Sequence, residues 1–339
     1  MFKIIEARFY EKLEDKKVRC LVCPKQCIIP NKKRGFCRVR ENRDGVLYSL
    51  VYGKPASAGV DPIEKKPLFH FLPGSLAYSI STVGCNFACK HCLNWQISQA
   101  KPEDLPSIDL APEKVVENAV KEGCKIIAFT YIEPVMFYEY MMDIAKQARK
   151  EKLKTVIVTN GYVNPAPAKK LYRNIDGANV DLKAFTEEFY KKICAGELKP
   201  VLDTLKIIKE QGCWLEITNL IIPTLNDDLT KIKEMCEWIK KNLSDSVPLH
   251  FSRFFPHYKL KDLPPTPVST LKNAYKIAKD IGLKYVYLGN VPQGEEEYTI
   301  CPKCKETVIQ RSSFYELLEN NIVDGKCKFC KTMIDGVFD

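Results

Sequence analysis

Three cysteines stand close together in the stretch GCNFACKHC, with a C-x3-C-x2-C spacing at Cys85, Cys89 and Cys92. A closed structural zinc site takes four ligands and a disulfide takes two thiols, so three neighbouring thiols indicate a metal site with one position left open. Three thiolates can bind three irons of a [4Fe-4S] cluster and leave the fourth iron without a protein ligand. Such an open iron is able to hold a substrate or a cofactor.

Two further groups of four cysteines lie near the ends of the chain. In a reducing compartment, clustered thiolates are metal ligands more often than disulfides. The C-terminal motifs CPKC and CKFC predict a zinc ribbon or a rubredoxin-like mononuclear iron site; zinc is favoured because Lys305 and Lys331 stand where rubredoxin knuckles carry glycine. The N-terminal group fits a closed zinc site and an auxiliary [4Fe-4S] cluster equally well. The two groups are Cys20, Cys23, Cys27 and Cys37, and Cys301, Cys304, Cys327 and Cys330.

The elements that must position these thiols follow an alternating strand and helix pattern. Six βα units demand a parallel sheet with right-handed crossovers, and six fall short of the eight units of a closed TIM barrel. The first predicted strand ends just before Cys85, at the sheet edge where parallel α/β folds build their active sites. The predicted strands are 76–83, 125–130, 154–159, 178–182, 213–222 and 247–254, and the predicted helices are 113–122, 135–151, 166–173, 200–211, 228–242 and 269–281.

We therefore predict an α/β fold with a partial (β/α)6 TIM-like barrel over residues 51–290. A metal-binding element with four cysteines is expected at 1–50, and a zinc-ribbon or rubredoxin-like four-cysteine domain at 291–339, after the polar segment NVPQGEEEYT. A single cysteine, Cys194, follows the fourth predicted strand. It is either a hydrogen-atom relay or a small buried apolar residue.

The cysteine motif CNFACKHC resembles the CxxxCxxC signature of the radical S-adenosylmethionine (SAM) enzymes, whose usual fold is a partial (β/α)6 barrel. The resemblance implies that the amino and carboxylate groups of SAM chelate the open iron. An electron from the cluster then splits the sulfonium, and the resulting 5′-deoxyadenosyl radical abstracts hydrogen from a substrate.

Segments at successive strand ends resemble the pyruvate formate-lyase activating enzymes, which are radical SAM enzymes that act on a glycyl-radical protein. They are TYIEP, VTNGY, VDLK and RFFPHY, although Tyr131 and Ile132 replace a glycine pair and Val158 replaces an acidic residue. The resemblance implies a reducing electron donor of the ferredoxin or flavodoxin type and a protein substrate. It nominates as SAM-binding residues Glu133, Thr159, Asn160, Asp181, Lys183 and His257.

Nearly the whole chain resembles one family, the AMMECR/Memo-associated radical SAM proteins (AmmeMemoRadiSam). The shared runs include VRCLVCPKQC, RGFCRVRENRDG and VYGKPASAGVDPIEKKPLFHFLPG. This resemblance implies a functional link to Memo-type and AMMECR-type proteins. Two alternative hypotheses are a zinc-ribbon protein that binds nucleic acid and a radical SAM enzyme that modifies RNA.

The composition describes a globular chain, because 45% hydrophobic and 28% charged residues argue against disorder. No apolar run approaches the roughly 18 residues of a membrane helix, and the first residues lack the apolar core of a signal peptide, so we expect a cytoplasmic protein without a membrane partner. The formal net charge of +10 suggests nucleic-acid binding, but metal-bound thiolates reduce it to about +5. The spread of both charge signs argues against nucleic acid as a partner.

Overall fold

The computed structural model describes residues 4–292, 294–312 and 315–339. Its centre is an eight-stranded sheet in the order β14-β13-β12-β11-β10-β9-β8-β7, in which β7 is antiparallel to β8 and the other neighbours are parallel. Edge strands β7 and β14 are not paired with each other, so the barrel is open. The strands are β7 (Ser57–Pro62), β8 (Leu76–Ser81), β9 (Ile126–Phe129), β10 (Lys154–Thr159), β11 (Gly177–Asp181), β12 (Trp214–Ile221), β13 (Leu249–Arg253) and β14 (Val286–Gly289).

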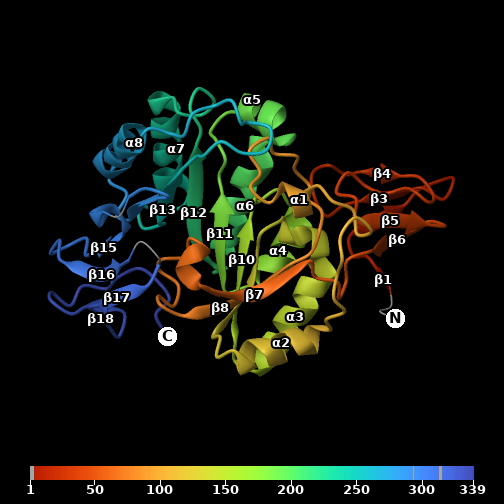
Figure 1. Ribbon diagram of the computed structural model, residues 1–339, viewed down its shortest axis with the longest axis horizontal. Coiled ribbons are helices and arrows are strands. Elements are labelled where there is room, and N and C mark those ends of the chain that lie inside the picture. Colours follow the sequence, from red (N-terminus) through yellow and green to blue (C-terminus); the bar gives the residue numbers. More distant parts are fainter. Residues whose placement is uncertain (1–3, 293, 313–314) are drawn as a thin grey trace.

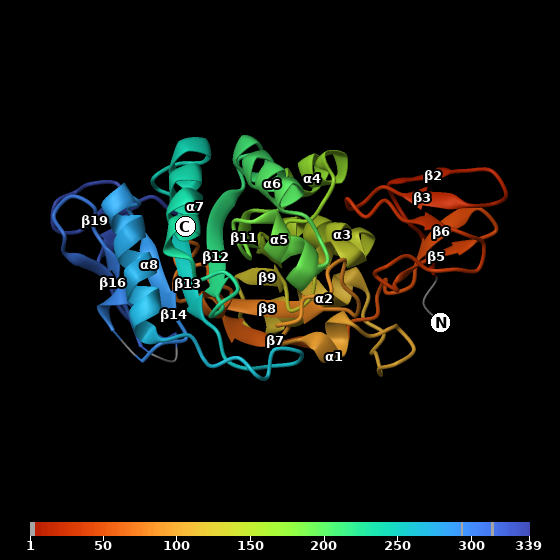
Figure 2. The same cartoon turned by 90° about the horizontal axis from the view of Figure 1, so that it is seen from above.

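Helices connect the parallel strands and lie along the outer side of the curved sheet, as Figure 2 shows. Proline occupies the first turn of α2 and α4, where its missing N–H costs nothing, and Gly282 ends α8 with a left-handed φ of 97°. The longer helices are α2 (Pro112–Lys121), α3 (Tyr138–Lys150), α4 (Pro165–Tyr172), α6 (Leu198–Glu210), α7 (Leu229–Asn242) and α8 (Val268–Ile281). Short turns are α1 (Trp95–Ser98), α5 (Glu187–Phe189), a π-helical turn Tyr190–Cys194, and 3₁₀ turns Ile63–Lys65, Pro134–Phe137 and Glu295–Glu297.

The predicted α/β fold with an open parallel sheet is confirmed, and each of the six predicted strands and six predicted helices has a counterpart. The sheet is larger than predicted, because β14 adds a seventh parallel strand and β7 adds an antiparallel edge. The run Val286–Gly289 is rich in β-forming residues, but four residues are too few to establish an alternating period.

Small antiparallel sheets lie at opposite ends of the long axis of the molecule (Figure 1). The N-terminal ones have the orders β1-β6-β5 and β2-β3-β4, and the C-terminal ones β15-β16-β17 and β18-β19. Their strands are β1 (Ile5–Glu6), β2 (Tyr10–Lys12), β3 (Val18–Cys20), β4 (Ile28–Ile29), β5 (Arg40–Arg43), β6 (Val46–Ser49), β15 (Thr299–Ile300), β16 (Thr307–Arg311), β17 (Leu317–Asn320), β18 (Ile322–Val323) and β19 (Lys326–Cys327).

Residues 63–75, which connect β7 to β8, form a plug that fills the inside of the open barrel at the N-terminal ends of its parallel strands. Leu68 and Phe71 are fully buried there against Ala128 and Val156 of the sheet. Phe71 lies so close to Gly177 that a Cβ at this glycine would stand 2.9 Å from its ring, which explains why β11 begins with glycine. The plug leaves the upper part of the half-barrel, at the C-terminal ends of the strands, for polar side chains. Within the described residues, no helix is both long and apolar enough to cross a membrane.

Candidate functional site

The loop that carries the three clustered cysteines leaves the C-terminal end of β8. Its backbone is held by the π-helical turn, because the N–H groups of Ala88 and Lys90 donate to the carbonyls of Cys194 and Ile193 at 2.9 and 3.0 Å. Gly84 opens the loop with a φ of +89°, a conformation that favours glycine. The loop therefore stands at the edge of the sheet where sequence analysis predicts it.

The three thiols have different surroundings. Cys85 and Cys92 are half-buried, and Cys89 is buried. The Sγ of Cys85 accepts from the backbone N–H of Phe87 at 3.4 Å, and the Sγ of Cys92 lies 3.2 Å from the Ser98 hydroxyl. Burial raises the pKa of Cys85 and Cys92 above the usual value, so a bound cation is needed to hold them as thiolates. Three soft sulfur donors on one loop fit iron in a [4Fe-4S] cluster.

A hydrogen-bonded chain joins the ends of β9 and β10 to the cysteine loop. The buried carboxylate of Glu133 accepts from the Thr159 hydroxyl at 2.9 and 3.0 Å and from the Asn160 N–H at 2.7 Å. The Asn160 side chain then donates to the Oδ1 of Asn86 at 2.8 Å and lies 4.0 Å from the Sγ of Cys85. Burial raises the pKa of Glu133 to about 7. The structure thus brings Asn160 beside Cys85, and Glu133 orients both Thr159 and Asn160.

Asp181 and Lys183 form an ion pair at the end of β11, with 2.7 Å between Nζ and Oδ2. Burial works against the charged lysine, but the Asp181 carboxylate and the Cys89 thiol together raise the pKa of Lys183. The backbone here is fixed by Tyr190, whose hydroxyl accepts from the Lys183 N–H at 3.0 Å, and by Asn226, which donates to the Lys183 carbonyl at 2.7 Å. A cation and an anion are therefore presented together next to Cys89.

The loop that contains His257 also reaches the cysteine loop. The backbone N–H of Lys259 donates to the carbonyl of Lys90 at 3.0 Å, and the ring of Tyr258 stacks on Trp95 with centroids 5.1 Å apart. His257 itself is half-buried, and its Nε2 has no hydrogen-bond partner within the described residues. All six strand-end candidates thus lie on segments that converge on the same edge of the sheet.

Tyr131 replaces a glycine of the family pattern but keeps a glycine-like backbone, with a φ of +69°. Its carbonyl accepts from the side chain of Asn94 at 2.8 Å. Its hydroxyl donates to Asp61 of β7 at 2.6 Å, and the same carboxylate accepts from the buried Lys66 at 2.8 Å. Sequence analysis missed this polar group of Asp61, Lys66 and Tyr131, because it depends on pairing an edge strand with the barrel.

Two further residues, His91 and Cys194, lie close to the predicted cluster ligand Cys89. The ligand atoms of Cys89, His91 and Cys194 lie within 4.8 Å of one another, and all three residues are buried. Both ring nitrogens of His91 have no hydrogen-bond partner among the described residues, and burial lowers its pKa to about 3. The single cysteine Cys194 is therefore adjacent to a predicted cluster ligand, a closeness that no spacing in the sequence indicates.

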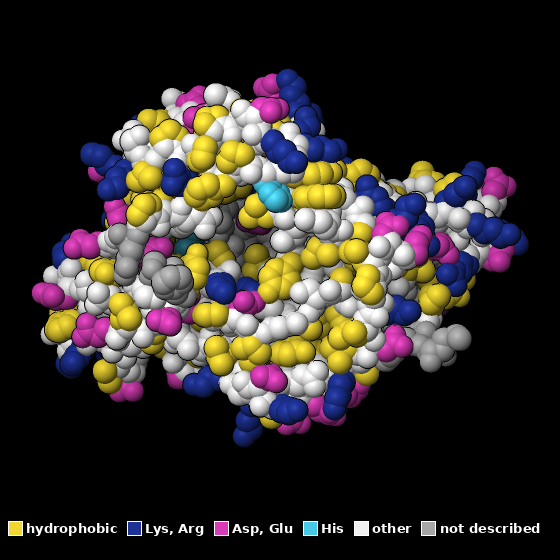
Figure 3. Space-filling view, viewed as in Figure 1, with side chains coloured by type: hydrophobic (Ala, Val, Ile, Leu, Met, Phe, Trp, Pro, Cys, Tyr) yellow, Lys and Arg dark blue, Asp and Glu magenta, His cyan; other side chains and the backbone are white. Residues whose placement is uncertain are grey.

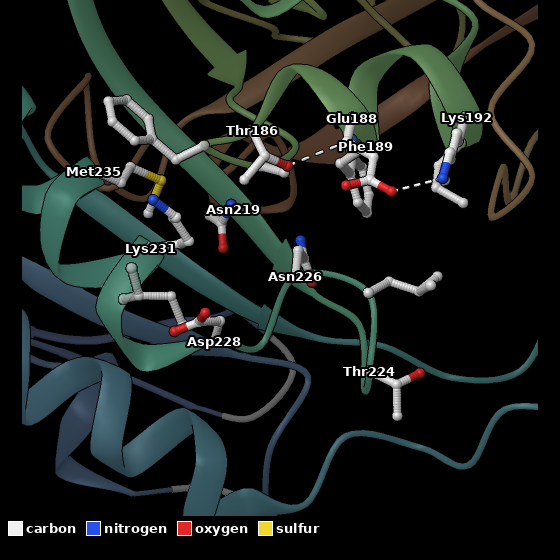
Figure 4. A pocket seen from close by; sticks show the side chains of 15 residues that line it. Thr186, Glu188, Phe189, Lys192, Asn219, Thr224, Asn226, Asp228, Lys231 and Met235 are labelled. Atoms are coloured by element: carbon white, nitrogen blue, oxygen red, sulfur yellow. Dashed lines mark hydrogen bonds and ion pairs between the residues drawn. The ribbon is translucent and has the colours of Figure 1, made fainter.

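A cavity of about 340 Å³ lies beyond Lys183, between the π-helical turn and the start of α7. Figure 4 shows Asn219 and Asn226 between Thr186 and Glu188 on one side and Lys231 on the other. On the face seen in Figure 3 the molecule is hollowed near its centre, and hydrophobic side chains and opposite charges surround the hollow. The strand ends are therefore open to molecules larger than water.

The structure also gathers each of the outer cysteine groups. The four C-terminal Sγ atoms lie within 4.8 Å of one another, including Cys301 and Cys330 at 3.6 Å and Cys304 and Cys327 at 3.7 Å. The four N-terminal cysteines line one cavity. These thiols form two groups in addition to the three cysteines of the central loop.

Comparisons with known proteins show what this chain is similar to. The family model of the radical SAM superfamily matches residues 79–239. The uncharacterized protein MJ0808 of Methanocaldococcus jannaschii is 48% identical over 331 residues, which cover 97% of this chain and 98% of that protein. The pyruvate formate-lyase-activating enzyme of Clostridium pasteurianum is 23% identical over 217 residues, 58% of this chain and 88% of the enzyme. The solved structure of Streptococcus suis SuiB bound to S-adenosylmethionine has a TM-score of 0.49 at 14% identity, covering 74% of this chain and 56% of that chain. The chain contains a radical SAM superfamily domain and is an enzyme that uses a [4Fe-4S] cluster and SAM.

Proposed function

We propose that Cys85, Cys89 and Cys92 hold the [4Fe-4S] cluster of a radical SAM enzyme whose target is a protein. The observation that carries this proposal is the meeting of the three thiols with the polar ends of β9, β10 and β11 at one edge of the sheet. When bound by these three thiols and reduced, a [4Fe-4S] cluster would supply the electron that splits SAM into methionine and a 5′-deoxyadenosyl radical, and this radical would take hydrogen from the substrate.

The strand-end side chains divide into binding and positioning roles in this proposal. Asp181 and Lys183 present one charge of each sign, which match the ammonium and carboxylate of SAM. Asn160 offers a short polar group beside Cys85, and Thr159 precedes it at the end of β10. His257 supplies a ring nitrogen whose hydrogen bond is unused. Glu133 positions Thr159 and Asn160, because its carboxylate oxygens accept from β10 and from a neighbouring backbone N–H.

A protein substrate is favoured by the similarity to the pyruvate formate-lyase-activating enzyme. Within this proposal the substrate is a glycyl-radical-type protein, and the electron donor is a ferredoxin or flavodoxin. The quoted N-terminal and barrel motifs also favour membership of the AmmeMemoRadiSam family, and with it a functional link to Memo-type and AMMECR-type proteins.

The remaining assignments concern the outer parts of the chain. The C-terminal four-cysteine group takes zinc or a single iron, since its sulfurs stand close to the separation of about 3.8 Å that tetrahedral Zn–S bonds of about 2.3 Å require. We divide the chain into a metal-binding element at 1–50, the barrel at 51–290 and a four-cysteine domain at 291–339. The proposed location is the cytoplasm, where thiols stay reduced.

The test is an anaerobic assay of SAM cleavage. Protein reconstituted with iron and sulfide, then given a reductant and SAM, should release 5′-deoxyadenosine. Cys85→Ser should lower the cluster absorbance and reduce product to background, whereas Cys124→Ser, which removes a buried thiol outside the three groups, should keep both. Full activity in Cys85→Ser would refute the proposal.

A further inference from the structure

The four N-terminal cysteines surround a cavity between two small sheets and the barrel. Cys20 ends β3, Cys23 and Cys27 lie in the following turn, and Cys37 precedes β5. Cys20, Cys23 and Cys37 are buried, at 7–8% exposure, and Cys27 is half-buried. The thiols line this cavity together with Arg40.

The N-terminal group differs in spacing from the C-terminal one. The C-terminal sulfurs gather within 4.8 Å, as the ligands of one tetrahedral ion do. Among the described residues, no three of the N-terminal thiols gather that tightly. A four-iron cluster binds each cysteine at a different iron, so it needs thiols spread around a space rather than pointing at a common centre. The four N-terminal thiols are spread around their cavity in this way.

Arg40 supplies an independent observation at the same cavity. It is 1% exposed, and its Nη2 donates to both oxygens of Glu139 at 3.1 and 2.9 Å. Its Nε and Nη1 are buried without a hydrogen-bond partner among the described residues, and an unsatisfied buried donor destabilises the folded protein. Bridging sulfides and thiolates of an anionic cluster are acceptors for these two donors.

The cavity lies directly against the loop that carries Cys85, Cys89 and Cys92. A Cβ at Gly84 would stand 2.5 Å from the carbonyl oxygen of Cys37, and Asn86 lines the cavity itself. On the other side, the Asn164 side chain donates to the carbonyls of Leu21 and Cys23 at 2.8 and 3.1 Å. The N-terminal thiols are thus joined by direct packing to both the cysteine loop and the loop after β10.

We propose that Cys20, Cys23, Cys27 and Cys37 hold a second four-iron cluster, ligated by four thiolates and hydrogen-bonded by Arg40, beside the SAM-cleaving site. The C-terminal group, in contrast, holds a single ion. This assignment does not depend on SAM turnover, because it concerns what the N-terminal thiols bind.

The decisive protein is the full chain with Cys85, Cys89 and Cys92 all changed to alanine. After anaerobic reconstitution it should still contain about four irons and four sulfides, and reduction with dithionite should give a [4Fe-4S] electron paramagnetic resonance signal. Adding Cys20→Ala and Cys37→Ala should remove that iron and the signal. Adding Cys124→Ala and Cys236→Ala instead, which removes two buried thiols outside the groups, should leave the iron content and the signal unchanged.

A measurement on the wild-type chain does not depend on whether the cysteine variants fold. We expect about eight irons per chain and two reduced signals, of which SAM alters only one. About four irons with two zinc ions in the wild type, or zinc and no sulfide in the triple variant, would overturn the second cluster. Eight irons with no 5′-deoxyadenosine would keep this inference and refute the proposed SAM cleavage.

Discussion

The carboxylate of Glu133 shows how one buried charge organises the site. It accepts from the hydroxyl of Thr159, from the N–H of Asn160 and from the N–H of Val135, and it is only 2% exposed. These donors favour the charged form, but burial outweighs them and raises its pKa to about 7. The residue therefore holds a proton over a pH range in which the unfolded chain has lost it.

We predict that Glu133→Gln removes a pH dependence of stability. As pH rises from about 4.5 to about 7, the unfolded wild type loses its proton before the folded protein does, so the wild type loses stability on the order of 3 kcal/mol relative to the variant. The difference is flat below and above this window. Urea unfolding of both proteins at several pH values measures it.

The exposed Glu117 provides the matched control for this experiment, as Glu117→Gln in α2 changes no buried carboxylate. Its stability should follow that of the wild type at every pH. A constant difference between the wild type and Glu133→Gln from pH 5 to 8 would contradict the assigned burial effect.

At the scale of elements, the two C-terminal knuckles depend on an unusual backbone conformation. Lys305 and Lys331, which directly follow the second cysteine of each motif, have left-handed φ values of 66° and 62°. Their N–H groups donate to the carbonyls of Cys301 and Cys327 at 3.1 and 2.9 Å, which closes each turn. Each knuckle keeps the conformation that glycine adopts at least cost, although neither position is glycine.

We predict that Lys305→Gly stabilises the metal-loaded protein. A left-handed non-glycine residue costs about 1–2 kcal/mol, and glycine loses part of this gain through its greater freedom in the unfolded chain, so the expected gain is about 0.5–1 kcal/mol. The measurement is the thermal unfolding midpoint. Lys303→Gly, in the same knuckle and without a left-handed φ, should lower the midpoint. A lower midpoint for Lys305→Gly as well would contradict the role of the turn.

At the scale of the molecule, Glu216 ties the plug segment to the sheet. Its carboxylate accepts from the backbone N–H groups of Phe69 and His70 at 3.0 and 2.8 Å, from Trp214 Nε1 at 3.1 Å, and it pairs with His250 Nε2 at 2.7 Å. His70 in turn lies 2.6 Å from the carbonyl of Asp335 through its Nδ1. The half-barrel, its plug and the C-terminal segment are thus connected through one buried carboxylate.

Replacing this carboxylate by alanine leaves four hydrogen-bonding groups, three of them buried, without their acceptor. We predict that Glu216→Ala lowers the free energy of unfolding by about 3–5 kcal/mol, while Glu234→Ala at a half-exposed position of α7 changes it by less than about 0.5 kcal/mol. Guanidinium denaturation followed by tryptophan fluorescence measures both. A loss as small as that of Glu234→Ala would show that the plug is held by other contacts.

Patterns along the chain were sufficient for much of the site. The C-x3-C-x2-C spacing and the four-cysteine groups are local, and strand and helix periods are read over a few residues, so both could be predicted. The contribution of Asp61 and Lys66 to the site could not be predicted from the sequence, because it requires the antiparallel pairing of β7 with β8. The strand β14 was too short to show a period.

The sequence by itself determined that thiols would meet polar strand ends at one edge of a parallel sheet, because the chain order of strands and helices leaves few topologies. Only the tertiary structure decided which distant groups stand beside the clustered cysteines. It placed Cys194 within reach of Cys89, the carbonyl of Cys37 against Gly84, and the donors of Arg40 in the N-terminal cavity. These contacts depend on the packing of segments far apart in the chain, and sequence spacing carries no record of that packing.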